Sequence, residues 1–174
     1  MTRLANTGSL KGYLAVAMAA ALAAALPALA TAPPAEALIV PQRGIDEIEL
    51  KMTRAQVIRA KGRPDAERLV RNEIIGPQRM MRYGPTRAFF GGFRRAAGVV
   101  TINSRDPRER TRSGVGIGST PSQVLAGVEG IRCRGPARIH TCVKGRFRPG
   151  KRVTIFDISP QGRVNLVLIG FVID

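Results

Sequence analysis

His140 is the only histidine in the chain, so it is the only side chain of a kind that commonly serves as a general base near neutral pH. A Ser-His-Asp or Cys-His arrangement needs such a base to take the proton of its nucleophile. His140 lies between Cys133 and Cys142 among arginines, and their positive charge opposes protonation of the imidazole. A surface or strand histidine is the simpler interpretation. We therefore predict no catalytic residue and expect that the protein is not an enzyme.

Residues 114–120, Gly-Val-Gly-Ile-Gly-Ser-Thr, superficially resemble a phosphate-binding loop. No lysine precedes the Ser-Thr pair, as a Walker motif requires, and Ser119 stands where a dinucleotide fingerprint has its last glycine. The stretch is better explained as an approach to a helix, whose start at Thr120 could also hold an anion. We predict no small-molecule cofactor.

Two groups of carboxylates have no arrangement that suggests acid–base catalysis. Asp46, Glu47 and Glu49 precede a predicted helix and would complement its dipole. Asp106 and Glu109 lie in an arginine-rich turn, where we expect exposed ion pairs.

Cys133 and Cys142 are the only cysteines. A metal site that combined them with His140 would have three ligands at an unusual spacing, whereas structural zinc has four. In an exported protein a disulfide is the default, and by chain entropy it would contribute about 2–3 kcal/mol. We predict this disulfide and no metal.

Residues 83–95 are the stretch most typical of a binding surface, because aromatic side chains stand beside arginines in a glycine-rich hairpin. The same composition suits stacking on nucleic-acid bases or sugar rings. The alternative is that Phe89 and Phe93 belong to the core. The candidate partner-binding residues are Tyr83, Phe89, Phe90, Phe93, Arg94 and Arg95.

A short capped helix is predicted from Thr53 to Gly62. Thr53 fits an N-cap, Gln56 stands at the capping-box spacing, Gly62 supplies a left-handed stop and Pro64 prevents continuation. The pattern recurs at Thr120, Gln123 and Val124, with a proline at the first helical position. The recurrence indicates two similar half-repeats, although Thr-x-x-Gln-Val could also coincide by chance.

Strand-like segments separated by turns follow each helix. They are residues 68–70, 79–83, 88–90 and 99–102 in the first half, and 137–143, 152–158 and 163–172 in the second. The last of these is apolar on both faces and is therefore expected at the centre of a sheet. We predict an α+β fold of two helix-plus-meander half-repeats, with short helices packed on an antiparallel sheet.

The N-terminal region has the features of an export signal. Arg3 and Lys11 precede an apolar run, and Ala28-Leu29-Ala30 fits a cleavage site, although an uncleaved membrane anchor is an alternative. We predict a signal peptide at 1–30, a proline-rich linker at 31–44 and half-repeats at 45–111 and 112–174. The expected location is secreted or in the cell envelope.

The chain carries 28 Lys and Arg against 12 Asp and Glu, a net charge of +16. Such a surface attracts polyanions, but the arginines are scattered, as base composition alone would also produce.

The motifs Lys51-Met52-Thr53-Arg54-Ala55-Gln56-Val57 with Gly62-Arg63-Pro64-Asp65, and Ile117 to Val124, resemble those of SmpA/OmlA (BamE) envelope lipoproteins. The duplicated, exported form is similar to β-lactamase inhibitor protein. The second copy lacks Gly-x-Pro-Asp and the chain lacks a lipid-bearing cysteine near the signal. The resemblance implies a repeat whose members bind other proteins and are not enzymes.

These observations predict a non-catalytic binding module for a protein partner of unknown identity. The alternative is a basic surface that binds an anionic cell-wall polymer, a membrane surface with anionic headgroups, or nucleic acid.

Overall fold

A computed structural model describes residues 38–73, 76–91, 97–135 and 140–173. The predicted signal peptide lies outside these residues. The elements are, in chain order, β1 (Ile39–Val40), β2 (Gly44–Ile45), β3 (Ile48–Glu49), α1 (Arg54–Lys61), β4 (Ala66–Asn72), β5 (Gly76–Tyr83), β6 (Thr86–Phe90), β7 (Val99–Ser104), α2 (Pro121–Gly127), β8 (Ile131–Arg134), β9 (Thr141–Gly145), β10 (Arg152–Ile158) and β11 (Val164–Phe171).

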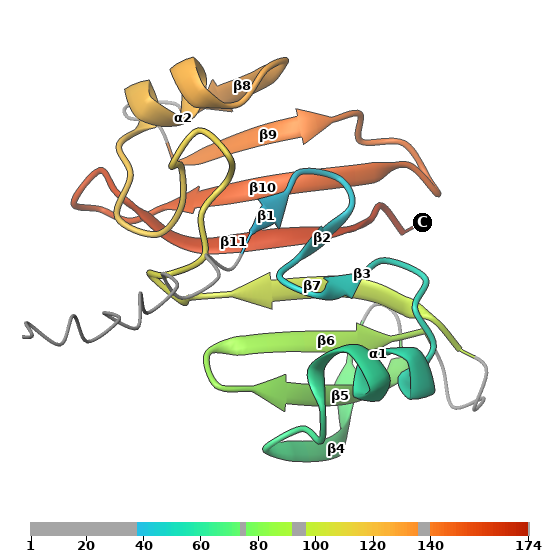
Figure 1. Cartoon of the computed structure of the whole chain (residues 1–174). Helices are drawn as coiled ribbons and strands as arrows, with labels where there is room; N and C mark the ends of the chain where they lie inside the picture. The colour runs from blue at the N-terminus through green and yellow to red at the C-terminus, as the bar shows by residue number, and fades with distance from the viewer. Residues whose placement is uncertain (1–37, 74–75, 92–96, 136–139, 174) are drawn as a thin grey trace, which may run out of the picture. The chain divides into compact units, whose positions relative to one another are not determined.

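Eight strands form one antiparallel sheet in the order β4-β5-β6-β7-β11-β10-β9-β8 (Figure 1). Each run of four consecutive strands is a meander, and the last strands of the two runs pair with each other. At this junction Ile102 of β7 stands opposite Ile169 of β11, and both are fully buried. The prediction that the last apolar strand is central is confirmed.

The predicted class, α+β with two helix-plus-meander half-repeats, is wrong, because the described chain is mostly β. The two helices have only eight and seven residues, and each completely buries a single valine, Val57 or Val124. Hydrophobic burial therefore comes mainly from the strands. A second sheet, of β1, β2 and β3, also has no counterpart in the second run of the described chain.

The helix caps are as predicted. The Oγ1 atoms of Thr53 and Thr120 accept hydrogen bonds from the backbone N–H of Gln56 and Gln123, and each glutamine side chain accepts from the backbone N–H of its threonine. These bonds satisfy N–H groups that a helix start leaves free.

The three-stranded sheet packs against the large one and was not predicted. Ile39, Ile45 and Ile48 are almost fully buried in the common core, so Ile39 is a core residue although it lies within the range expected to be a linker. The two turns are tight. Gln42 and Asp46 have positive φ angles of 63° and 53°, and a Cβ on Gly44 would lie 2.2 Å from the Ile48 carbonyl oxygen.

Cys133 and Cys142 form the predicted disulfide. They stand directly opposite each other on β8 and β9, so the bridge ties the outer strand to its neighbour. None of the described helices has the length and apolar character needed to cross a membrane.

Candidate functional site

The eight-stranded sheet has one covered face and one open face. Helices α1 and α2 and the small sheet lie over the covered face, which Figure 1 shows toward the viewer. Successive side chains of a strand point to opposite faces of the sheet. In each strand, the residues that alternate with the core residues therefore point to the open face. One open-face row crosses the sheet through Arg87, Asn103, Leu168, Ile155 and Val143, which are cross-strand neighbours.

An apolar trough of about 470 Å³ runs over the middle of the open face. Its lining contains no charged side chain. It consists of Gln78, Phe89, Thr101, Asn103, Phe147, Val153, Ile155, Leu168, Phe171, Val172 and Ile173. Phe147 is 65% exposed, which is a large exposed fraction for an aromatic apolar side chain. Gln78 Nε2 and Asn103 Oδ1 are buried without a hydrogen-bond partner.

A second hollow, of about 650 Å³, adjoins the trough and shares Phe147 and Ile155 with it. We call it the arginine hollow, because its charged lining is Arg132, Arg134, Arg146 and Arg148. All four arginines are exposed, and within the described chain none of them forms an ion pair. The trough and the hollow together offer an apolar surface that ends in unneutralised positive charge.

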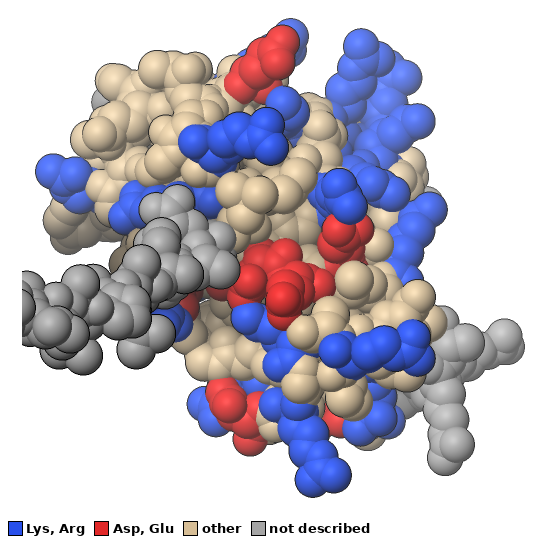
Figure 2. Space-filling view, in the orientation of Figure 1, with Lys and Arg blue, Asp and Glu red and all other residues tan. Residues whose placement is uncertain are grey.

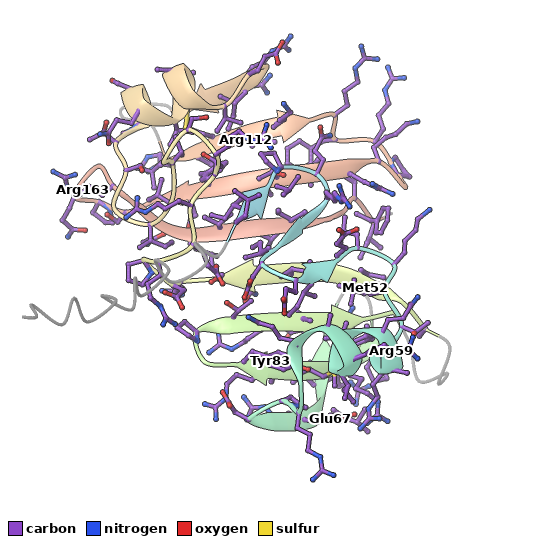
Figure 3. All side chains as sticks on the ribbon, viewed as in Figure 1. Met52, Arg59, Glu67, Tyr83, Arg112 and Arg163 are labelled. Atoms are coloured by element: carbon purple, nitrogen blue, oxygen red, sulfur yellow. A yellow bond between two sulfur atoms is a disulfide. The ribbon has the colours of Figure 1, made fainter. Side chains whose placement is uncertain are left out.

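The structure separates the residues predicted to bind a partner. Phe89 lies in the trough, but Phe90 points to the covered face and is 2% exposed, so it belongs to the core. Tyr83 is half-buried on the covered side, where its hydroxyl donates to the Gly62 carbonyl oxygen over 3.1 Å at the end of α1 (Figure 3). Phe93, Arg94 and Arg95 lie outside the described residues.

The sequence analysis missed the arginine hollow, although a signal for it exists. Residues 130–156 contain eight Arg and Lys and no Asp or Glu. Basic residues that alternate along a strand point to the same face of the sheet. Because the segment contains no acidic residue, they have no ion-pair partner within it. Phe147 stands between two of these arginines.

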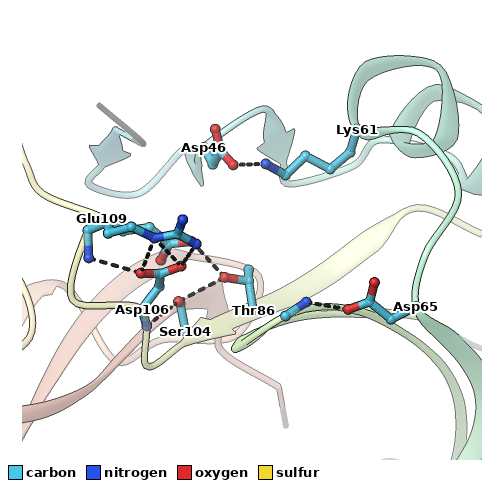
Figure 4. A network of polar contacts seen from close by, with 9 residues as sticks. Asp46, Lys61, Asp65, Thr86, Ser104, Asp106 and Glu109 are labelled. Atoms are coloured by element: carbon cyan, nitrogen blue, oxygen red, sulfur yellow. Dashed lines mark hydrogen bonds and ion pairs between the residues drawn. The ribbon is translucent and has the colours of Figure 1, made fainter. Parts of the chain in front are cut away.

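A polar cleft of about 790 Å³ lies on the covered side, where α1, the small sheet and the 105–110 segment come together. Figure 2 shows acidic side chains gathered there on an otherwise basic molecule. Asp46 pairs with Lys61, Asp106 pairs with Arg108 at 2.7 Å, and Asp65 Oδ2 accepts from the Gly84 N–H at 2.6 Å (Figure 4).

The exposed ion pairs expected for Asp106 and Glu109 are found only in part, because Asp106 pairs with the exposed Arg108 but both carboxyl groups are buried. Their residues are 6% and 3% exposed, and only Asp106 has a basic partner. The Arg108 hydrogen bonds lower the pKa of Asp106. Glu109 Oε1 instead accepts from the Thr86 hydroxyl at 2.6 Å, and Thr86 is also hydrogen-bonded to Ser104.

Burial raises the pKa of Glu109, against the opposing effect of hydrogen bonds from Ser104 and Thr86. Its Oε2 atom is buried and has no hydrogen-bond partner. Among the residues described, no three acidic, histidine or cysteine side chains are grouped so that they could hold a metal ion. The cleft is therefore a network of carboxylates, of which Asp46, Asp65 and Asp106 have charged or backbone partners and Glu109 is buried with a raised pKa.

Comparisons with known proteins add little. No family model matches the chain, and no curated protein matches it. Among solved structures, a DUF4309 family protein (YjgB) from Bacillus subtilis is similar, with 16% identity, a TM-score of 0.38, and coverage of 70% of this chain and 79% of that one. The resemblance to BamE-like and inhibitor-like proteins stays a prediction.

Proposed function

We propose that this protein is a non-catalytic binding module that docks a protein partner on the open face of its large sheet. One observation carries the proposal: the apolar trough and the arginine hollow adjoin each other on a sheet face that no helix or second sheet covers among the described elements. Exposed apolar surface rimmed by polar groups is typical of protein interaction sites.

The composition of this surface supports a protein partner. Aromatic and arginine side chains are the types most often found at energetically dominant positions of interfaces. Here Phe89 and Phe147 lie in the trough, and Arg132 and Arg134 line the adjoining hollow. The surface is also shallow, which suits the broad contact of a macromolecule better than the enclosure of a small ligand.

Export and kinship are part of the same proposal. The basic start and apolar run of residues 1–30 support export to the envelope or the medium, where the disulfide is expected to persist. Kinship with BamE-like and β-lactamase inhibitor-like proteins rests on the two capping-box motifs, both of which form.

Site-specific photo-crosslinking in the producing cell tests the docking surface. A photoreactive residue at Ile155, in the floor shared by the trough and the hollow, should give a discrete crosslinked protein. The same residue at Leu125, which is 48% exposed on α2, should not. Equal crosslinking at both positions, or none at Ile155, would contradict the proposal.

The four unpaired arginines favour one alternative, a surface that binds an anionic polymer or anionic headgroups. Binding of that kind weakens steeply with salt, because it releases condensed counterions, whereas an apolar interface tolerates salt. If the crosslink at Ile155 no longer forms when a cell extract is irradiated at about 1 M salt, this alternative is favoured.

A further inference from the structure

We infer that the docked partner is an extended polypeptide segment that places apolar side chains in the trough and carboxylates in the arginine hollow. The inference rests on the proposed function and names the chemistry of its partner. It depends on two features: the missing counter-charge and the spacing of the arginines beside the apolar trough.

Among its described lining residues, the hollow contains no negative charge that could neutralise the arginines. Asp157 is the one acidic residue in the described parts of β8 to β11, and it does not line the hollow. Four guanidinium groups held together without counter-charge repel one another. A ligand that brings carboxylates relieves this repulsion and can form bidentate hydrogen bonds with each guanidinium.

The spacing of the arginines matches an extended chain. Arg132 and Arg134 alternate with Cys133 on β8, so they project on the same side about 6.6 Å apart along the strand. An extended segment repeats at the same interval, so carboxylates at positions i and i+2 face both arginines. A helical partner would separate neighbouring side chains on one face by three or four residues instead.

Binding of matched synthetic peptides tests the inference. The first peptide has alternating Val and Thr followed by Glu-Thr-Glu, and two others carry Gln or Lys in place of Glu, each with a neutral fluorophore. By fluorescence anisotropy on the oxidised full domain, the Glu peptide should bind about tenfold more tightly than the Gln peptide. The Lys peptide should bind more weakly still.

Variants locate the interaction. Arg132→Gln with Arg134→Gln should abolish the preference for Glu over Gln. Arg59→Gln with Arg112→Gln removes the same charge from exposed positions on α1 and the 105–119 segment, and should preserve the preference (Figure 3).

Equal affinity for the Glu and Gln peptides would overturn the inference. So would an equal loss of the preference for Glu in the two double arginine variants. If crosslinking at Ile155 still yields a discrete protein, the proposed docking function stands and only the partner's chemistry is wrong. Two results together would instead support the polyanion alternative: sodium polyphosphate binds at the same arginines, and the apolar half of the peptide has no effect on peptide affinity.

Discussion

Burial of the Glu109 carboxyl links the stability of the fold to pH. Its pKa is raised above the ordinary value of 4.5, so the folded state holds this proton after the unfolded chain has lost it. Between those two pKa values the free energy of unfolding falls as pH rises, and the stabilisation present below pH 4.5 is lost as pH passes through the raised pKa. Glu109→Gln should remove this decline while keeping an acceptor for Thr86.

Urea unfolding over a pH series measures the effect. Glu129→Gln, at an exposed position near the end of α2, is the matched control and should keep the decline of the parent protein. Asp106 and Glu67 have lowered pKa values because arginines hydrogen-bond to them, so their contributions are lost only as pH falls below their ordinary range. If the unfolding free energy of Glu109→Gln still declines over the same pH range, another group causes the decline.

Single residues also show where sequence reasoning succeeds and fails. The disulfide could be predicted because only two cysteines exist. Phe89 and Phe90 could not be told apart, since adjacent strand residues point to opposite faces and local composition does not say which face is covered. Glu109 looks exposed in an arginine-rich turn, and only the packing of Thr86 and Ser104 from distant strands makes it buried.

The elements that the sequence specifies best are the two capped helices. Replacing either cap, by Thr53→Ala or Thr120→Ala, should cost about 1 kcal/mol of unfolding free energy, because a first-turn N–H loses its acceptor. Ser122→Ala, at an exposed position in α2, should change it by less than about 0.5 kcal/mol. Chemical denaturation measures all three, and a neutral Thr53→Ala would show that tertiary packing alone holds α1.

Most strands of the large sheet were predicted, because each carries enough apolar or β-branched residues to mark it between turns. The exception is β8, whose four residues Ile-Arg-Cys-Arg were not predicted as a strand. The small sheet was missed because two-residue strands have no period to detect. Ile39 lies in a proline-rich stretch that resembles a tether, and its burial depends on contacts with Ile45 and with strands much later in the chain. For example, the backbone N–H of Gln42 donates to Thr154 Oγ1 at 2.6 Å.

At the scale of the whole folded region, the contact between β7 and β11 joins the two meanders into one sheet. Ile102→Ala and Ile169→Ala should each cost about 2–5 kcal/mol, since both side chains are fully buried at this contact. We expect one unfolding transition for both meanders. Either substitution should therefore increase the rate of amide hydrogen exchange in both β5 and β10. Loss of protection confined to the mutated meander would mean that the two fold independently.

The pairing of β7 with β11 explains why the arrangement of the strands could not be predicted from the sequence. Local patterns indicated helices and strands but not which strands pair, and pairing of β7 with β11 joins segments about sixty residues apart. The prediction of two helix-plus-meander half-repeats on an antiparallel sheet overestimated the helices and did not include the second, three-stranded sheet.

The central position of β7 has a consequence for biosynthesis. When β7 has emerged from the ribosome, its partner β11 is still to be translated, so the N–H and C=O groups of Thr101–Ser104 that bond to β11 have no partner yet. A bare strand edge of this kind readily recruits the same edge of another nascent chain. A cell that makes this protein must therefore shield the unfinished polypeptide until its final hairpin is available.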